Sequence, residues 1–269
     1  MQRRLLAVDI DGTLVNDQKE ILPETKRDIW EYIRQGGIFV LATGRATPGV
    51  GRYIRELELE SRGGYVVAYN GARTFCPKEG RVIAETRVPR EAYDSILEAA
   101  DALDLPLIAY RNDVAVTEKA NDRYFHLETS INGLEIDRVA SLRAALDFDT
   151  PKFMITGEPE FLAGAEPKLR AALAGAPVDV YRSEPCFLEI TAHGSDKGAA
   201  ILSLAASLGL SRADTMACGD GFNDVSMLRR VGFGVAMANA QAPAKAAADA
   251  GTLSNAENGV GEAIRRYAL

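Results

Sequence analysis

The sequence predicts an α/β protein whose doubly wound parallel sheet, of the Rossmann-like kind, is interrupted by an inserted α+β domain. Two observations predict this fold. Short apolar runs alternate with amphipathic stretches in roughly the first 70 residues and again after residue 195, which is the pattern of parallel strands joined by helices. Between these stretches the pattern changes to pairs of strands with short polar turns, interspersed with helices. We expect the core at residues 1–84 and 190–269, and the inserted domain at 85–189.

The first part of the expected core opens with the apolar run from Leu5 to Val8, which is too short for a core helix and reads as a buried parallel strand. A helix is expected from Pro23 to Gln35, because proline suits a first helical turn and the glycine pair that follows ends the helix. The remaining elements expected here are a strand at 38–42, a helix starting at Pro48, a strand at 65–69, and a hairpin of 74–75 with 82–84.

The middle of the chain carries the signals of the inserted domain. Two hairpins are expected, one pairing 107–110 with 114–117 and the other pairing 178–181 with 187–191. Helices are expected at 91–103, 139–146 and 161–173, and a strand at 153–156. The alternating pattern then resumes with a helix at 199–208, a strand at 214–218, a helix at 225–231, a strand at 234–237, and helices at 243–250 and 260–267.

Composition excludes several function classes. A net charge of -7 argues against a general nucleic-acid-binding protein, which would need a basic face. No apolar run reaches membrane-spanning length and no secretory signal is recognisable, so we expect no membrane partner. Cys76, Cys186 and Cys218 are widely spaced and look like reduced thiols of a cytoplasmic protein. We expect a monomer or a weak homodimer.

Two acids follow the first strand. Asp9 and Asp11 are two residues apart, so an extended backbone points both side chains the same way, and Gly12 permits a tight turn behind them. Neighbouring carboxylates repel each other. A divalent cation is the simplest way to offset that repulsion. An acidic loop after a strand is the alternative reading of this motif alone.

Further polar residues lie at other strand ends or helix starts, where doubly wound sheets bind their ligands: Thr43, Gly44, Lys197, and the stretch from Asp220 to Asp224. Each has an alternative explanation, because Thr43 could cap a loop, Lys197 could be solvated, and Asp224 could cap its helix. Together with the acid pair, however, they supply a nucleophile, a proton donor, metal-binding oxygens and donors for phosphate oxygens. These are the groups that phosphoryl transfer needs.

In these motifs the sequence resembles the haloacid dehalogenase superfamily, specifically its Cof-type sugar-phosphatase branch. The resemblance covers the whole chain and keeps the order of the motifs. The matching stretches are Asp9-Ile10-Asp11-Gly12-Thr13, Ala42-Thr43-Gly44-Arg45, Asn70-Gly71-Ala72, Lys197-Gly198, Gly219-Asp220-Gly221-Phe222-Asn223-Asp224, Gly234-Val235-Ala236-Met237-Ala238-Asn239-Ala240, and Lys245. One departure is Asn258, which stands before Gly259 and Val260 where the branch usually has an acid.

The resemblance implies specific roles. Asp9 would attack phosphorus to form an aspartyl-phosphate that water hydrolyses, and Asp11 would serve as acid and then base. Mg²⁺ would be held by Asp9, the backbone carbonyl of Asp11, and Asp220, with Asp224 orienting the water molecules of the metal. The groups implied to hold the phosphate oxygens are Thr43, the Gly44 amide, Lys197 and Asn223. The inserted domain would be a cap that selects the substrate.

The resulting expectation is a magnesium-dependent phosphoric monoester hydrolase acting on small phosphorylated metabolites, such as sugar phosphates or phosphorylated cofactors. A phosphomutase on the same scaffold and a non-enzymatic phosphate-binding regulatory protein remain alternatives. A receiver module is disfavoured, because its acid pair and phosphorylated aspartate lie on different strands. Polar residues of the expected cap have mostly surface-charge explanations; they are Arg87, Arg111, Asn112, Arg123, His126, Glu128 and Arg182.

Overall fold

The computed structural model describes residues 4–269, which form two compact units. The first unit contains the chain up to Gly44, Gly51–Ala84 and Asp196–Leu269, and the second contains Arg45–Val50 and Glu85–Ser195. Residues 1–3 of the expected core lie outside the described residues. Among residues 4–269, neither unit contains a helix that is long and apolar enough to cross a membrane.

The expected boundaries of the insertion need two corrections. The boundary between residues 189 and 190 falls inside strand β11 (Phe187–Ala192), which pairs with β10 up to Ala192, so the second unit continues to Ser195. The short segment Arg45–Val50 also belongs to the second unit. Its Ala46 N–H donates to Asn132 Oδ1 at 2.7 Å, a long-range contact for which the local sequence pattern gives no signal.

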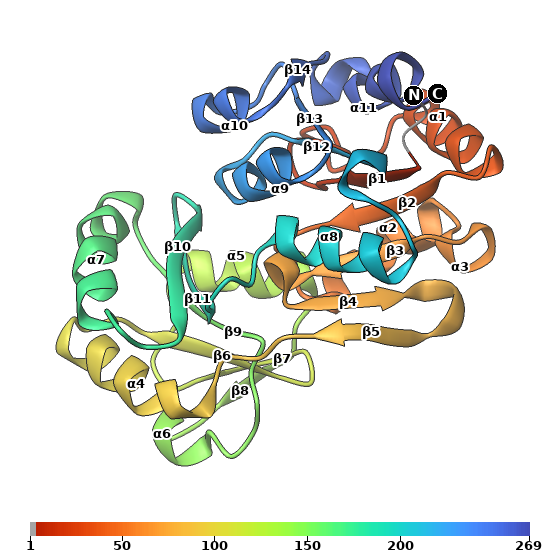
Figure 1. Cartoon of the computed structure of the whole chain (residues 1–269). Coiled ribbons are helices and arrows are strands. Elements are labelled where there is room, and N and C mark those ends of the chain that lie inside the picture. The colour runs from red at the N-terminus through yellow and green to blue at the C-terminus, as the bar shows by residue number, and fades with distance from the viewer. Residues whose placement is uncertain (1–3) are drawn as a thin grey trace. The chain divides into compact units, whose positions relative to one another are not determined.

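The first unit is built on an eight-stranded sheet in the order β14-β13-β12-β1-β2-β3-β4-β5 (Figure 1). The pairs from β14 to β3 are parallel, and β4 runs antiparallel to β3. From β1 the chain continues to β2 and β3 on one side and later returns as β12 on the other, so the strand order reverses between β1 and β12. The strands are β1 (Leu5–Val8), β2 (Ile38–Ala42), β3 (Tyr65–Ala68), β4 (Arg73–Cys76), β5 (Arg81–Glu85), β12 (Thr215–Gly219), β13 (Phe233–Ala236) and β14 (Ala250–Gly251).

Helices cover the two faces of this sheet, which explains why the central strands are apolar throughout. Every residue of β1 is fully buried, as expected for a parallel strand with helices on both sides. Helix α1 packs against α11, and α8 packs against α9. The helices of this unit are α1 (Pro23–Arg34), α2 (Gly51–Glu56), α3 (Leu59–Arg62), α8 (Lys197–Ser207), α9 (Val225–Arg230), α10 (Ala242–Ala247) and α11 (Gly259–Ala263), the last continued by a π-helical turn at Ile264–Ala268.

The second unit contains a six-stranded sheet in the order β10-β11-β9-β6-β7-β8. The sheet is not purely antiparallel as the hairpins predict, because β7 and β8 pair in parallel. Its strands are β6 (Leu107–Arg111), β7 (Val114–Thr117), β8 (Ile136–Arg138), β9 (Lys152–Thr156), β10 (Val178–Glu184) and β11. Its helices are α4 (Tyr93–Ala102), α5 (Arg123–Asn132), α6 (Leu142–Ala145) and α7 (Pro159–Ala172).

The two faces of this second sheet differ in polarity. One face, with Ala109, Phe153 and Ile190, joins the apolar core that also contains residues of α4 and α7. The other face carries buried polar side chains, among them Lys152 and Glu189, whose Nζ and Oε1 atoms lie 3.2 Å apart. A sheet that is apolar on one face alone leaves the second face for polar contacts.

Three of the expected elements are shortened or split in the structure, and the elements α5 and β8 were not expected from the sequence. The helix expected from Pro48 begins as a 3-10 turn at Thr47–Val50 and is split, with α3 starting after the left-handed Glu58. The helix expected at 139–146 shortens to α6. The alanine-rich stretch expected to remain helical up to residue 250 ends at Ala247, because β14 pairs with β13 and sheet pairing overrides the helical propensity of alanine.

Candidate active site

A buried lysine joins two of the acids implicated by the sequence. Lys197, the first residue of α8, is fully buried, and its Nζ donates to Asp9 Oδ1 at 2.6 Å and to Asp224 Oδ1 at 2.8 Å. Burial alone would lower the pKa of Lys197, but the two carboxylates raise it above its usual value, so the ammonium form persists. The solvated-lysine alternative for Lys197 is therefore wrong.

Asp224 organises the turn that follows β12. Its Oδ2 atom accepts hydrogen bonds from the N–H groups of Asp220 and Gly221, each at 2.9 Å, while its Oδ1 atom accepts from Lys197. The carboxylate makes no capping bond to α9, so the helix-cap alternative does not describe it. A carboxylate held by two backbone donors and one ammonium is fixed in place, and it fixes the backbone of Asp220 in turn.

Asp220 is positioned by the loop that follows β1. Thr13 Oγ1 donates to Asp220 Oδ1 at 2.7 Å. Gly12 has a φ of +81°, and a Cβ atom at this position would lie 2.3 Å from Asp220 Oδ2. Glycine is therefore required both by its backbone conformation and by the close approach of the carboxylate. Thr13 belongs to a matched sequence motif but has no predicted role, since a contact across 207 positions leaves no local signal.

Three carboxylates meet at this point. Oxygen atoms of Asp9, Asp220 and Asp224 all lie within 4.8 Å of one another. Burial, together with repulsion from Asp224, raises the pKa of Asp9 well above its usual range, although Lys197 acts in the opposite direction. Hard carboxylate oxygens are the ligands that Mg²⁺ and Ca²⁺ prefer, and a divalent cation would offset the repulsion among them. The donor set therefore fits the expected metal.

Asp11 has a different environment from Asp9. Its side chain is 33% exposed, and its Oδ1 atom accepts a hydrogen bond from Lys19 Nζ at 2.8 Å. A partly exposed acid beside a buried one is suited to exchanging protons with a bound ligand or with water. The carboxylate of Asp11 is not part of the group of three, so its predicted metal contact depends on its backbone carbonyl and stays a prediction.

The remaining residues implicated in phosphate binding gather around Asn70. Asn223 Nδ2 donates to Asn70 Oδ1 at 3.0 Å, and Asn70 N–H donates to the carbonyl of Thr43, also at 3.0 Å. A Cβ atom added at Gly44 would lie 3.0 Å from the Asn70 amide group. Asn70 is 2% exposed and adopts a left-handed conformation with a φ of +52°. Asn70 belongs to a matched sequence motif but has no predicted role. An asparagine before glycine is nevertheless a sequence signal for this left-handed conformation.

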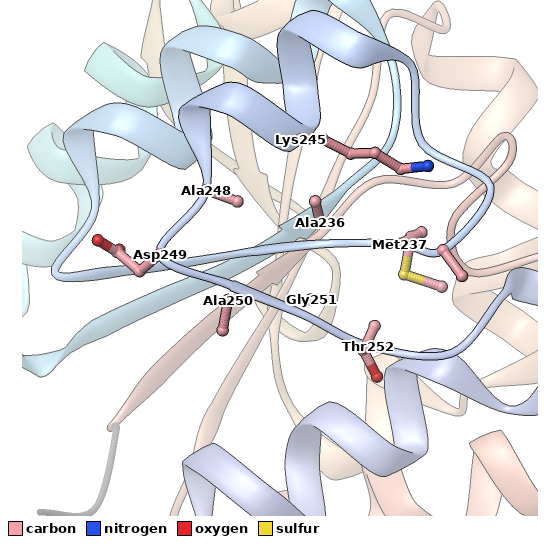
Figure 2. Close-up of a pocket in the computed structure, with 9 residues that line it drawn as sticks. Ala236, Met237, Lys245, Ala248, Asp249, Ala250, Gly251 and Thr252 are labelled. Carbon is pink, nitrogen blue, oxygen red and sulfur yellow. The ribbon is translucent and has the colours of Figure 1, made fainter.

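The strand ends thus bring the predicted site residues into two groups in the first unit. The first group combines Lys197 with the acids, and the second joins Thr43, Gly44 and Asn223 through Asn70. Both lie where β1, β2 and β12 end, at the reversal of strand order. Lys245, which also matches a motif, lies apart from these groups and lines a pocket of about 240 Å³ between α10 and β14, where its side chain extends toward Met237 (Figure 2).

The candidate residues of the second unit are mostly engaged in surface contacts. His126 is exposed, and Asn112 has a positive φ in the turn between β6 and β7, where asparagine is favoured for its backbone. Glu128 is buried and accepts a hydrogen bond from Tyr110 OH at 2.9 Å. Each of the four arginines forms an ion pair within its own unit: Arg87 with Glu85 and Asp149, Arg111 with Asp137, Arg123 with Glu158, and Arg182 with Glu166.

Comparison with known proteins identifies the family. Residues 6–264 match the haloacid dehalogenase-like hydrolase family. The chain belongs to this family. A solved haloacid dehalogenase-like hydrolase from Bacteroides thetaiotaomicron is 35% identical, with 98% of this chain and 99% of that chain covered and a TM-score of 0.87. The predicted Rossmann-like core with an inserted α+β domain is confirmed by this similarity.

Two relatives of this haloacid dehalogenase-like hydrolase carry phosphatase names. YxeH of Bacillus subtilis, named provisionally as a phosphatase, is 33% identical over 278 residues, which cover 99% of this chain and 98% of YxeH. The HMP-PP phosphatase of Serratia proteamaculans is 30% identical over 237 residues, which cover 88% of this chain and 84% of that protein. The prediction of a phosphatase-type enzyme is confirmed at this level, while the metal and the substrate are matters for proposal.

Proposed function

We propose that the protein is a magnesium-dependent phosphatase that hydrolyses small phosphorylated metabolites through an aspartyl-phosphate on Asp9. The observation that carries this proposal is the environment of Asp9. Its carboxylate is buried, bound by Lys197 at 2.6 Å, and grouped with Asp220 and Asp224 at the end of β1. A carboxylate that is oriented by an ammonium and shielded from water is prepared for nucleophilic attack.

The metal would be held by the carboxylates of Asp9 and Asp220 and by the backbone carbonyl of Asp11, with Asp224 holding the loop behind them. When bound, Mg²⁺ would polarise the phosphoryl oxygens and neutralise charge that develops during transfer. The support is the cluster of carboxylate oxygens within 4.8 Å and the hydrogen bond from Thr13 that fixes Asp220.

The reaction then needs two proton transfers, for which Asp11 is the proposed group. In the first step a carboxylate oxygen of Asp9 forms a bond to phosphorus, the ester P–O bond breaks, and Asp11 gives its proton to the leaving alkoxide. In the second step water attacks the phosphoryl group, Asp11 accepts its proton, and the bond from phosphorus to Asp9 breaks to release inorganic phosphate. The partial exposure of Asp11 supports this role, because its proton must be replaced or moved in each cycle.

Binding of the phosphoryl oxygens is proposed for Thr43, the amide of Gly44, Lys197 and Asn223. Lys197 supplies the positive charge, and Asn223 is held by Asn70 so that its amide group keeps one orientation. Neutral donors together with one buried ammonium are a suitable environment for a phosphate group, whose charge would otherwise be repelled by the acids.

We propose that the second unit is a cap that selects the substrate. The support is that this unit, Arg45–Val50 with Glu85–Ser195, is compact in itself and holds none of the carboxylates proposed to bind the metal. The free thiols of Cys76, Cys186 and Cys218 support a cytoplasmic location.

The test is release of inorganic phosphate from a panel of sugar phosphates, phosphorylated cofactors and HMP-PP, with Mg²⁺ or with EDTA. We expect hydrolysis with Mg²⁺, loss of hydrolysis with EDTA, and recovery when Mg²⁺ is restored. Asp9→Asn should lower turnover by about a thousandfold or more, the scale on which removal of a nucleophile acts. Asp17→Asn, on the same loop but with an exposed side chain, is the matched control and should retain activity.

Two results would contradict the proposal. Hydrolysis at the wild-type rate by a folded Asp9→Asn variant would remove Asp9 as the nucleophile. Isomerisation of a sugar monophosphate that depends on added sugar bisphosphate, with no net release of phosphate, would instead identify a phosphomutase.

A further inference from the structure

Two asparagines from the C-terminal part of the chain contact the loop that follows β1. Asn239 Nδ2 donates to the carbonyl of Gly12 at 2.7 Å. Asn239 Oδ1 accepts the N–H of Asn255 at 3.1 Å, and Asn255 Nδ2 donates to the carbonyl of Val15 at 2.8 Å. The segments after β13 and β14 therefore hold the loop at two points, its turn and its end. We call Asn239 and Asn255 the asparagine tether.

The contact with Gly12 involves a carbonyl that is not bound within the loop. The carbonyls of Asp9 and Ile10 are bound within the loop, where they accept the N–H groups of Leu14 and Val15. Gly12 lies between these carbonyls and the N–H groups that they accept, and it has a φ of +81°, a conformation that glycine adopts without steric cost. Its carbonyl needs an external donor if that conformation is to be fixed.

The peptide group of Gly12 connects the two parts of the site that must act together. Asp11 precedes it, and Thr13, which donates to Asp220 at 2.7 Å, follows it. Because a peptide group is planar, a donor bound to the Gly12 carbonyl also sets the direction in which the backbone enters Thr13. Rotation of this peptide would change ψ of Gly12 and φ of Thr13, and would therefore shift the Thr13 hydroxyl relative to Asp11.

We infer that Asn239, supported by Asn255, is a positioning residue that holds the Asp11–Thr13 backbone in its active conformation. This inference rests on the proposed function, since it assigns the residue to the same site. Asn239 does not belong to the core, because it is exposed, and its side chain makes hydrogen bonds to Gly12 and Asn255. An exposed side chain contributes little to packing, so its two hydrogen bonds are better explained by a role in orienting the loop that carries the proposed catalytic residues.

Two variants separate the contacts of Asn239. Asn239→Asp keeps an oxygen that accepts the N–H of Asn255 but removes the donor to Gly12, and Asn239→Ala removes both contacts. We expect both variants to lower kcat and to raise the Mg²⁺ concentration for half-maximal activity by about 10-fold or more, the scale on which residues behind metal ligands act. KM for the phosphate ester should change less than kcat, because Thr43, Gly44 and Asn223 are not moved.

Ser254→Ala is the matched control. Ser254 Oγ donates to Glu257 at 2.6 Å in the turn that carries Asn255, without contacting the loop after β1. This variant should lower the melting temperature yet leave kcat and the Mg²⁺ requirement at wild-type values. It separates a general loosening of the C-terminal segment from a specific effect on Gly12.

The deciding readout does not need turnover. Mg²⁺ alone should raise the melting temperature of the wild-type protein, and the midpoint of that titration should shift to higher concentration in Asn239→Asp but not in Ser254→Ala. Wild-type midpoints and wild-type kcat in a folded Asn239→Asp variant would overturn the inference. If the wild-type protein binds Mg²⁺ but releases no phosphate from any ester, the proposed function fails. The Mg²⁺ titration midpoints of wild type and Asn239→Asp can still be compared to test the role of Asn239. Absence of any Mg²⁺ response in wild type would overturn both.

Discussion

At the scale of single residues, Gly12 links the backbone of the nucleophile loop to a carboxylate from a distant strand. The space that a side chain would occupy at Gly12 is filled by the carboxylate of Asp220, which lies 2.3 Å from the Cβ position. Gly36 has nearly the same φ, +89°, but nothing lies within 4 Å of its Cβ position. Comparing substitutions at Gly12 and Gly36 therefore separates the free-energy cost of the backbone conformation from the cost of displacing Asp220, a proposed metal ligand.

We expect Gly12→Ala to impair the site and Gly36→Ala to affect stability alone. Both substitutions place alanine in a left-handed conformation, at a cost of about 1–2 kcal/mol. In Gly12→Ala the new methyl group must also displace Asp220, so the Mg²⁺ concentration for half-maximal activity should rise by about 10-fold or more. Urea denaturation and Mg²⁺ titration of phosphate release measure the two effects. Equal activity in the two variants would mean that Asp220 need not occupy this place.

Asp11 can be tested through the leaving group. A sugar alkoxide leaves poorly without a proton, whereas a nitrophenolate delocalises its charge and needs the proton much less. Asp11→Asn should therefore slow formation of the phosphoenzyme from a sugar phosphate more than from p-nitrophenyl phosphate. General acid catalysis contributes a factor of about 100 to 10,000, which sets the expected difference.

The measurement must isolate the first step, because both substrates share the second one. Pre-steady-state release of the alcohol or phenol, followed with each substrate, meets this need. If Asp11→Asn slows that step by the same factor for both, its role as the acid would have to be abandoned. The partial exposure of Asp11 and its contact with Lys19 would then point to a role in loop geometry.

The sequence could place the residues at strand ends and helix starts, but not the residues that support them through one specific hydrogen bond. The convergence of Asp9, Lys197 and Asp224 follows from their positions at strand ends and helix starts, and the structure brings them within hydrogen-bond distance. Thr13 and Asn239 each donate one hydrogen bond to a partner more than 200 positions away, Thr13 to the Asp220 carboxylate and Asn239 to a backbone carbonyl. Such partners depend on register and loop conformation, which local patterns do not encode.

At the scale of elements, the helix α5 is not apparent from the sequence. The buried positions of α5 include Glu128, Thr129 and Asn132, so its inward face lacks the apolar periodicity by which helices are recognised. Its start is nevertheless marked, since Asp122 accepts the N–H groups of Tyr124 and Phe125. The amphipathic helices α1, α4 and α7 were predictable to within a few residues.

The departure at Asn258 also becomes understandable at this scale. Asn258 precedes α11 in a left-handed conformation, accepts the N–H of Gly261, and donates to Asp28 Oδ2 at 3.0 Å. An aspartate here would place two carboxylates against each other. The amide of Asn258 instead joins α11 to α1 through Asp28, so the altered motif strengthens the contact between the helices and leaves the acidic site untouched.

The buried acid of α5 predicts how stability depends on pH. Burial raises the pKa of Glu128, the nearby charge of Glu189 adds to this, and Lys152, the Tyr110 hydroxyl and Arg45 oppose it. A carboxyl group with a raised pKa favours folding in its protonated form, so stability falls as pH rises from about 4.5 through the folded-state pKa. Glu128→Gln cannot titrate but still accepts the Tyr110 hydrogen bond.

We therefore expect the stability of Glu128→Gln relative to wild type to increase with pH above about 4.5. Urea denaturation between pH 4 and 8 measures this difference. Glu98→Gln, at an exposed position of α4 in the same unit, should show no such trend. A constant relative stability would mean that folding does not shift the pKa of Glu128, and a relative stability that falls with pH would mean that the Glu128 anion stabilises the fold.

At the scale of the whole molecule, the chain passes between its two units next to proposed site residues. The first passage follows Gly44, and the last precedes Asp196 and Lys197. The sequence predicted two units from the change in strand pattern, but not the return of Arg45–Val50 to the second unit. That segment is held by contacts to α5, the helix that the sequence also did not reveal.

All the carboxylates proposed to hold Mg²⁺ belong to the first unit, so the metal should stabilise that unit selectively. A ligand at 100 times its Kd stabilises the state that binds it by about 2.7 kcal/mol. Hydrogen exchange that requires complete opening of the first unit should therefore slow about a hundredfold. We expect this protection in β1 and β12, and much less in β9 and β11, when exchange is followed by mass spectrometry with and without Mg²⁺. In Asp220→Ala the protection should disappear from β1 and β12. Equal protection of β9 and β11 in the wild type would mean that the two units open together, and that the division of the chain into separate compact units does not extend to its unfolding.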